Sequence, residues 1–361
     1  MQKHSIARAV AGARWNPRDG LIGGDQGIWL DPSDLTTMFQ DSAGTTPVTA
    51  VEQSVGLIRD KSGRNNHAFQ STSANRPTLS ARYNQYVGTE AMATQNVTTL
   101  ATSYKLTFSG TGSITLSGTA TGTYTAGTYT VTCTAGTLTS TVSGSVTQAS
   151  IVPANQSSLP YQRVNTATDY DSDQTKFPWY LKFNGTSSSL QTASINFTAT
   201  DKMFVSAGVR NITRGSYNVL AELSSTVNTN NGSFSLFTWH QDLSANALFQ
   251  SKATLTSNAF STDTSFNPPK TFVFTSIGNT AGTPNDTALV RLNGTQASIS
   301  TADQGTGNYG NYPLYIGARA GTSLFFNGYL YQLVICGRPT AVPIDQITRT
   351  EEFVNRKTKA Y

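Results

Sequence analysis

Hydrophobic and polar residues alternate along most of this chain with a period of two, which is typical of half-buried β-strands. From Trp179 onward the alternating runs recur at short intervals, and Gly, Asn and Thr residues separate them. This spacing predicts an antiparallel jelly roll, an all-β sandwich. The strands expected there cover residues 180–183, 189–195, 203–210, 219–223, 233–239, 247–250, 270–277, 287–292, 313–316 and 329–335.

Two further strands are expected nearer the start of the chain, at residues 27–31 and 55–60. A polar turn follows the first strand, and Ser33 or Asp34 is suited to cap a short helical turn there. The second strand leads into residues 61–68, which are rich in the residue types that turns favour.

One segment near the end of the chain has a helical rather than a strand-like period. Ile344, Ile347 and Val354 recur at intervals close to the helical repeat. Pro343 stands where a helix begins, and basic residues at the other end complement the helix dipole. We therefore expect a C-terminal helix over residues 344–356.

Residues 97–152 interrupt the sandwich pattern with a stretch of very low charge. Of residues 101–150, 31 are Thr, Ser or Gly, and Lys105 is the only charged residue. Alternation persists nonetheless, as at Tyr104 and Leu106, and Gly-containing turns separate the runs. The stretch predicts a small immunoglobulin-like β domain. A flexible Thr/Ser-rich stalk is the alternative.

The chain is therefore expected to contain one large β-sandwich with an insert. A basic N-terminal arm occupies residues 1–26. The sandwich is discontinuous and covers residues 27–96 and 153–361, with the immunoglobulin-like domain between them at residues 97–152. Because the insert is predicted to be independent, a short Gly/Ser linker should be able to replace it.

The N-terminal arm carries no acidic residue in its first eighteen positions. We expect it to be an assembly element that lies along an acidic groove of another subunit. Arginines there can form bidentate pairs with carboxylates, and an aromatic residue can anchor the contact. A frayed terminus is the alternative. The residues concerned are Lys3, Arg8, Arg14, Trp15 and Arg18.

Composition narrows the class of protein. Only 12% of the residues are charged, against about 25% in ordinary globular domains, so Ser, Thr, Asn, Gln and Gly must cover the surface. The 17 Phe and 15 Tyr residues suffice for a packed core, which argues against disorder. We expect no nucleic-acid partner, because no basic run with interleaved aromatics occurs. We also expect no membrane span and no signal peptide.

Residues that form disulfides or bind zinc are sparse. Cys133 and Cys336 fall in strand-like runs of different modules. Disulfides are rare in proteins assembled in a reducing cytosol, so two buried free thiols are expected, with a disulfide as the alternative. The three histidines are too scattered for a zinc site, and His67 is expected to form a hydrogen bond within its own turn.

Four segments far apart in the chain share a pattern known from one class of β-sandwich. They are Gly27-Ile-Trp-Leu-Asp-Pro-Ser-Asp, Asp60-Lys-Ser-Gly-Arg-Asn-Asn-His-Ala, Tyr180-Leu-Lys-Phe-Asn-Gly, and Tyr315-Ile-Gly-Ala-Arg with Phe326-Asn-Gly-Tyr-Leu-Tyr-Gln-Leu-Val-Ile. In their order and spacing they resemble the laminin-G-like or concanavalin-A-like lectin domains of tailed-phage virion proteins. Pro32 departs from the pattern, in which a small residue is usual. The resemblance covers most of residues 27–360, less the insert.

The resemblance implies a non-enzymatic structural protein of a tailed-phage particle, assembled in the host cytoplasm. A tail fibre or appendage and a head-surface decoration both fit. The expected partners are other virion proteins and copies of this chain, with a host-surface glycan as a further partner. A carbohydrate-binding module of a bacterial surface protein and, with less support, a polysaccharide-degrading enzyme are the alternatives.

Paired acids, which glycoside hydrolysis requires, are missing from the expected strands. The reaction needs two carboxylates about 5–10 Å apart, a distance that acids two or four residues apart on one strand would provide. The chain has five Glu residues, and none has a second acid at that spacing in its strand. Glu222 comes nearest, and it is expected to be a solvent-facing carboxylate at a strand end. We therefore expect no enzymatic activity.

Asp169, Asp171 and Asp173 resemble the start of a calcium-binding loop. An EF-hand would then need Gly and Glu where this chain has Gln174 and Tyr180. The three carboxylates are expected to form at most a loose Ca²⁺ site, and an acidic connector is the alternative. No other cofactor is expected.

Exposed aromatic residues are candidates for stacking on sugar rings. The candidates are Trp239, Tyr309 and Tyr312, together with the polar loop at residues 308–311. The alternative is that they belong to the core, because sandwiches bury alternate residues along each strand.

Overall fold

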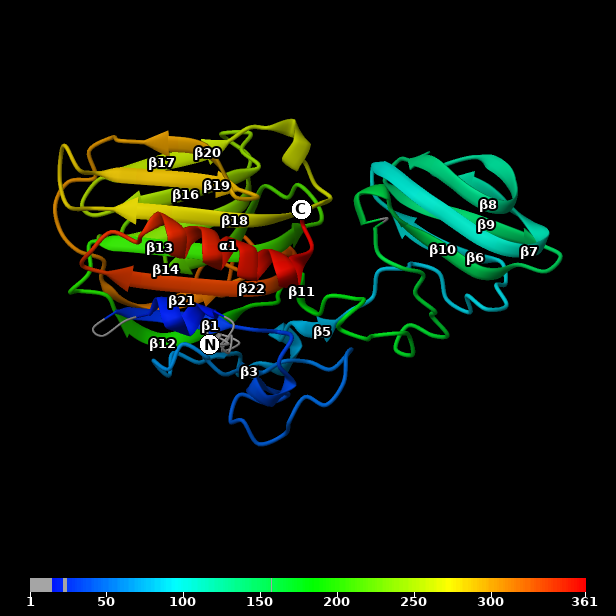
Figure 1. Cartoon of the computed structure of the whole chain (residues 1–361), viewed down its shortest axis with the longest axis horizontal. Coiled ribbons are helices and arrows are strands. Elements are labelled where there is room, and N and C mark those ends of the chain that lie inside the picture. Colours follow the sequence, from blue (N-terminus) through cyan, green and yellow to red (C-terminus); the bar gives the residue numbers. More distant parts are fainter. Residues whose placement is uncertain (1–14, 22–24, 157) are drawn as a thin grey trace, which may run out of the picture.

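The chain folds around two facing β-sheets, which a computed structural model describes for residues 15–21, 25–156 and 158–361 (Figure 1). Neighbouring strands of the first sheet are antiparallel. In spatial order they are β20 (Thr295–Ser300), β19 (Thr287–Leu292), β18 (Lys270–Asn279), β13 (Lys202–Asn211), β22 (Asn327–Arg338), β11 (Tyr180–Asn184) and β5 (Thr78–Ser80), and β1 (Gln26–Leu30) also pairs with β22.

The second sheet extends to three short strands from the beginning of the chain. These strands form one edge of the sheet, and β12 joins them to the longer strands. In spatial order the strands are β17 (Thr256–Ser261), β16 (Ala247–Lys252), β15 (Ser233–His240), β14 (Tyr217–Leu223), β21 (Asn311–Ile316), β12 (Leu190–Asn196), β4 (Ala68–Phe69), β3 (Leu57–Ile58) and β2 (Met38–Phe39).

Side chains from the inner faces of both sheets meet in one hydrophobic core. Val205, Ala207 and Val209 alternate along β13 and are fully buried, and they share a cluster with Leu236 and Phe249 of the second sheet. Burial of each large apolar side chain contributes about 1.5–3 kcal/mol. The predicted all-β sandwich is confirmed, and most of its strands lie close to their expected bounds.

The predicted C-terminal helix is also confirmed. Helix α1 (Ile344–Thr358) packs on the outer face of the first sheet, over β13, β18 and β22 (Figure 1). Its Val354 is buried in a cluster with Trp29 and Val273. Gly208 of β13 allows this close approach, because a Cβ atom there would lie 1.9 Å from the Oγ1 of Thr358.

The low-charge insert forms a third sheet with its own core. All of its neighbouring strands are antiparallel, and it has five strands in the described chain, fewer than the seven of an immunoglobulin constant domain. Figure 1 shows it beside the two-sheet body. The strands are β6 (Gln95–Thr99), β7 (Thr102–Gly118), β8 (Gly122–Cys133), β9 (Gly136–Ser143) and β10 (Thr147–Pro153).

Buried polar side chains hold the two connections of the insert together. The side-chain amide of Asn84 donates to the carbonyl oxygens of Ala149 (2.9 Å) and Gln162 (3.1 Å). The side-chain oxygen of Gln162 accepts the backbone N–H groups of Tyr83 and Asn84. The backbone N–H of Gln85 donates to the carbonyl of Ile151 (3.1 Å), so the chain enters and leaves the insert at nearly the same place.

We predict that the two-sheet body folds without the insert. The hydrophobic cluster of the insert includes Tyr86, so a clean excision removes residues 86–152 and joins the ends with a short Gly/Ser linker. Thermal unfolding of the shortened chain, followed by circular dichroism, should remain a single cooperative transition. Loss of that transition would mean that the insert belongs to the folding unit of the sandwich.

Short 3₁₀ turns connect several strands. One of them, η2, is the predicted capped turn, because the Asp34 carboxylate accepts the backbone N–H of Thr36 (3.2 Å). The 3₁₀ turns in the described chain are η1 (Pro17–Gly20), η2 (Leu35–Thr37), η3 (Ser73–Asn75), η4 (Ala154–Gln156) and η5 (Thr264–Phe266).

Both cysteines are buried as free thiols, as predicted. Cys133 lies in the core of the insert, whereas Cys336 lies in a small cluster on the outer face of the first sheet. Burial raises the pKa of the Cys336 thiol to about 12, which keeps it protonated at neutral pH. Within the described residues, no helix is both long and apolar enough to cross a membrane.

A buried carboxylate joins two of the recognised segments. Asp60 accepts the backbone N–H groups of Trp29 (2.8 Å), Ser62 (2.8 Å) and Asn66 (3.0 Å). One side chain thus attaches the turn at residues 60–67 to strand β1. This turn also fixes the point at which β4 begins.

Candidate functional site

Strands β3 and β4 direct alternate side chains to the outer face of the second sheet. Their register pairs Leu57 with Phe69 and Ile58 with Ala68. Ile58 and Ala68 belong to the sandwich core, so the two-residue period directs Leu57 and Phe69 outward. Arg59, directly after β3, and His67, directly before β4, continue this outward row.

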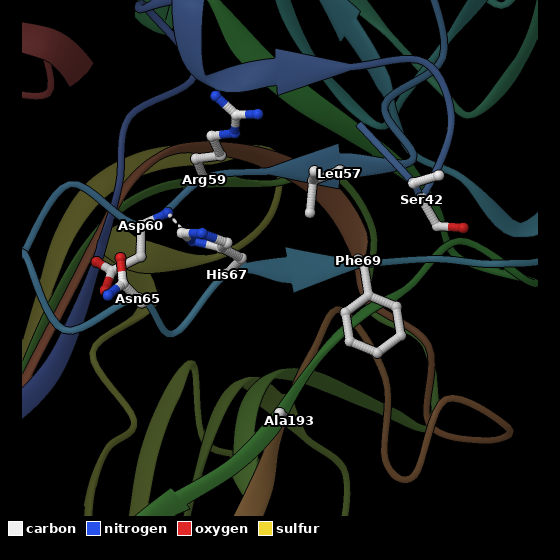
Figure 2. Close-up of a pocket in the computed structure, with 9 residues that line it drawn as sticks. Ser42, Leu57, Arg59, Asp60, Asn65, His67, Phe69 and Ala193 are labelled. Carbon is white, nitrogen blue, oxygen red and sulfur yellow. Dashed lines mark hydrogen bonds between the residues drawn. The ribbon is translucent and has the colours of Figure 1, made fainter. Parts of the chain in front are cut away.

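A hollow of about 740 Å³ opens over the outward row. Figure 2 shows Arg59 just past the end of β3 and His67 just before β4, with their side chains pointing in different directions and Phe69 further along β4. A loop after β2 contributes Ser42, and β12 contributes Ala193. The lining residues are Ser42, Ala43, Leu57, Arg59, Asp60, Asn65, His67, Phe69 and Ala193.

His67 is held in one orientation by its own turn. The backbone N–H of Asp60 donates to the Nδ1 atom of His67 (3.0 Å; Figure 2), which confirms the expected hydrogen bond. Because Nδ1 accepts, the neutral ring carries its proton on Nε2 and can donate it to a ligand. The Asp60 carboxylate is buried among backbone donors, so its role at the hollow is structural.

Arg59 supplies a positive charge at the hollow. Its guanidinium carbon lies 4.4 Å from the centroid of the Phe39 ring, a cation–π contact that limits its movement. The side chain is exposed, and no ion pair in the described part of the chain involves it. Asn65 adds an amide from the turn, where its backbone is left-handed (φ 60°). The hollow therefore combines an aromatic ring with several hydrogen-bond donors.

Two of the three aromatic candidates are core residues, and their prediction as sugar platforms is wrong. Tyr309 is only 1% exposed, and its hydroxyl shares a hydrogen bond with Ser251 (2.7 Å). Trp239 is 7% exposed, and the Arg214 guanidinium lies 4.5 Å from its ring centroid. Tyr312 is half-buried and packs against the sandwich core. Trp239 lies in β15 and Tyr312 in β21, whereas Tyr309 lies in the loop before β21 and enters the sandwich core from there.

The contacts of the three aspartates favour the connector over a loose Ca²⁺ site. Arg163 pairs with both Asp169 (3.6 Å) and Asp171 (3.3 Å). Asp173 instead accepts the backbone N–H of Thr175 (2.9 Å), a bond that lowers the pKa of its carboxyl. No cluster of three metal-binding side chains occurs in the described residues. The acidic stretch is a connector whose charges are paired locally.

Part of the N-terminal arm packs on the chain itself. The Trp15 ring lies 6.2 Å from the ring of Phe353 on α1, in an edge-to-face arrangement. Arg18 belongs to η1, which Asn16 caps. Trp15 therefore packs on its own chain, and the contact of the arm with another subunit stays a prediction. Three residues of the predicted arm lie outside the described part of the chain: Lys3, Arg8 and Arg14.

Glu222 is not the solvent-facing carboxylate that its sequence context predicts. It is 0% exposed, and the Nε atom of Arg319 lies 2.9 Å from one carboxylate oxygen. The other oxygen accepts the backbone N–H of Val227 (2.7 Å). Burial raises the pKa of Glu222, and Arg319 opposes that rise. The pair is a buried structural contact and does not line the hollow.

Sequence reasoning did not select Arg59 or Phe69 as site residues. Each stands in a short alternating run, and alternation assigns a residue to a face without showing which part of that face stays uncovered. His67 was noted only for its turn. The sequence does place Arg59 directly before the turn at residues 60–67 and His67 at its end, and this placement could have indicated that the two residues are close.

The fold defines the chain as an all-β sandwich protein with an inserted β unit. No protein-family model matches it, and no curated protein matches it. Similar solved structures include domain 4 of AbnA, a GH43 extracellular arabinanase from Geobacillus stearothermophilus, with a TM-score of 0.36 and 16% identity over 52% of this chain and 83% of that one.

Two other similar structures come from larger proteins. The binding domain of botulinum neurotoxin DC has a TM-score of 0.34 and 13% identity over 46% of this chain and 40% of that one. The NanB sialidase from Streptococcus pneumoniae has a TM-score of 0.32 and 15% identity over 41% of this chain and 23% of that one. Likenesses this weak assign neither a family nor a function to the chain.

Proposed function

We propose that this chain is a non-enzymatic glycan-binding protein and that its ligand lies in the hollow above β3 and β4. The observation that carries the proposal is the grouping of Phe69 with Arg59, His67 and Asn65 around one open space. Binding sites typically combine apolar lining with a few convergent polar groups. A sugar ring offers both an apolar face and a rim of hydroxyl groups, which matches this arrangement.

Each of these residues has a specific role in the proposed complex. The Phe69 ring packs against the apolar face of a sugar. Arg59 and the Nε2–H of His67 donate to ring hydroxyl oxygens, and the cation–π contact of Arg59 with Phe39 reduces the entropy lost on binding. The Asp60 turn holds His67 in place before the ligand arrives.

We predict that substitutions in the hollow weaken glycan binding without unfolding the protein. The wild type is screened on a printed array of bacterial cell-wall and capsular oligosaccharides, and the best ligand is titrated calorimetrically. Arg59→Gln should weaken binding about tenfold, because one charge-assisted hydrogen bond is lost, and Phe69→Ala should weaken it at least as much. Arg349→Gln, on the exposed side of α1, is the matched control. Equal affinities for all four proteins would refute the site.

The same proposal excludes hydrolysis of the bound glycan. Glycosidases need two positioned carboxylates, whereas Asp60, the acid at the hollow, already accepts backbone hydrogen bonds. We predict no release of reducing ends from capsular or cell-wall polysaccharides over long incubations. Release at a rate that Asp60→Asn or Glu222→Gln removes would establish an enzyme instead.

We also propose that the chain is a structural component of a tailed-phage particle. The four recognised segments support this proposal by their resemblance to virion lectin-like domains, and the low surface charge suits contacts with neighbouring subunits. Electron microscopy of particles labelled with an antibody against this chain tests it. Gold at a fixed position on the tail or head is expected, and unlabelled particles from cells that produce the chain would refute this location.

A further inference from the structure

A second cleft, of about 620 Å³, lies where the insert meets the sandwich. The sandwich side is the outer face of the first sheet, which contributes Lys182 of β11, Tyr329 of β22 and Arg210 of β13. The insert side includes Asn96 and Thr98 of β6. Both parts of the chain are therefore needed to form this cleft.

The cleft carries an excess of positive charge. Arg82, Lys182 and Arg210 line it, against a single acid, Glu52. Among the ion pairs of the described residues, none includes any of these three cations. Glu52 itself accepts hydrogen bonds from the hydroxyl groups of Tyr170 and Ser80. Positive charge at the cleft is thus left without a local carboxylate partner.

Neutral groups hold the two arginines in fixed positions. Arg82 donates to the carbonyl oxygens of Asn84 (3.1 Å) and Gln85 (2.8 Å). Arg210 is only 2% exposed and donates to the hydroxyl of Thr271 (3.1 Å). Carbonyl and hydroxyl oxygens orient a guanidinium without cancelling its charge. Both arginines therefore retain the capacity to attract an anion.

A rigid aromatic surface and an unpaired strand edge complete the cleft. The rings of Tyr180 and Tyr329 stack 3.9 Å apart at an angle of 11°, and Tyr180 is fully buried. Tyr329 is half-buried and cannot rotate away without losing this contact. Strand β6 ends the insert sheet in the described chain and pairs only with β9, so its other edge offers backbone hydrogen-bonding groups.

We propose that this cleft binds a carboxylate-bearing sugar chain between the insert and the sandwich. The carboxylate of the sugar is bound by Lys182 and the two arginines, and a neighbouring ring packs on Tyr329. Asn96, Thr98 and the edge of β6 bind hydroxyl groups from the opposite side. This site is separate from the hollow above β3 and β4, and it assigns the insert a role in recognition.

Calorimetric titration of the full chain with trigalacturonate and with sialyllactose tests the proposal, and the methyl esters of both serve as neutral matched probes. At least one acid should bind and its ester should bind about tenfold more weakly or not at all, because the charge-assisted bonds are lost. Binding should also weaken as salt is raised. Failure of both acids to bind, or equal binding of acid and ester, would overturn the proposal.

Substitutions then locate the site. Lys182→Gln and Tyr329→Leu should each weaken binding of the acid severalfold or more, whereas Arg59→Gln in the first hollow and Arg349→Gln on α1 should leave it unchanged. Thermal unfolding confirms that each variant is folded. Loss of acid binding in Arg59→Gln with retention in Lys182→Gln would assign the ligand to the first hollow and refute the cleft. Failure of array binding at the first hollow leaves this outcome unaffected, so the two proposals are tested separately.

Discussion

Replacing Arg319 with Met is expected to lower the free energy of unfolding by about 3–5 kcal/mol, because it leaves a buried carboxylate without its partner. Glu222 is fully buried, and its remaining hydrogen bond comes from the backbone of Val227. Met retains much of the apolar stem of Arg, so lost packing is a minor part of the cost. Urea denaturation at neutral pH measures the difference from the wild type.

The pH dependence of this cost identifies its cause. Burial raises the folded-state pKa of Glu222 above its value in the unfolded chain, and Arg319 opposes the rise. An acid with a raised folded-state pKa loses its stabilising contribution as the pH increases through that pKa. Without Arg319 the pKa rises further, so the cost of Arg319→Met should be largest at neutral pH and shrink on acidification.

A double variant separates charge from shape. In Glu222→Gln with Arg319→Met, the buried group is neutral, so much of the lost stability should return at neutral pH and the dependence on acidification should disappear. A cost for the single variant that is equal at neutral and acidic pH would contradict the buried-charge explanation.

Replacing Gly317 with Ala is expected to lower the free energy of unfolding by about 2–5 kcal/mol. The backbone there is left-handed (φ +82°), which costs a residue with a Cβ atom about 1–2 kcal/mol. The new Cβ atom would also lie 2.3 Å from ring carbons of Phe183, and overpacking of a core adds about 1–3 kcal/mol. Equilibrium denaturation in urea measures the combined effect.

Gly282 provides the matched control for this prediction. Its backbone is also left-handed (φ +90°), but a Cβ atom there would meet no atom within 4 Å. Gly282→Ala should therefore carry only the conformational cost, and the difference between the two variants isolates the clash with Phe183. Equal costs at both positions would show that the core accommodates the added methyl group.

These two predictions concern residues in the segments on which the resemblance rests. Gly317 and Arg319 both belong to the segment Tyr315-Ile-Gly-Ala-Arg, and Phe183 belongs to a second segment. Asp60, from a third, attaches its turn to β1 through Trp29. These residues stabilise the fold. The motifs therefore predicted the fold but did not locate a ligand-binding site.

Two strands with mainly polar sequences could not be predicted from the alternation of polar and apolar residues. Strand β17 reads Thr-Ser-Asn-Ala-Phe-Ser and β20 reads Thr-Gln-Ala-Ser-Ile-Ser, and each has too few apolar residues to predict a strand from alternation. They form because neighbouring strands supply their hydrogen-bond partners. Tertiary pairing therefore determines the strands at this side of the sandwich.

The candidate site was less predictable than the fold for a related reason. Tyr309 and Phe69 are both aromatic residues in β-rich surroundings, yet one is fully buried and the other lines an open hollow. Whether a face is covered depends on segments far away in the chain, such as those that pack over the first sheet. Local sequence contains the strand period but not this long-range coverage.

Mapping a bound glycan by NMR tests the central claim most directly. Backbone amide shifts of the isotopically labelled protein are followed during titration with the neutral oligosaccharide that binds best on the array. We predict that the largest changes occur in β3, β4 and the turn between them, including Arg59, His67 and Phe69. Changes confined to other surfaces, or no change at saturating concentrations, would contradict glycan binding at this hollow.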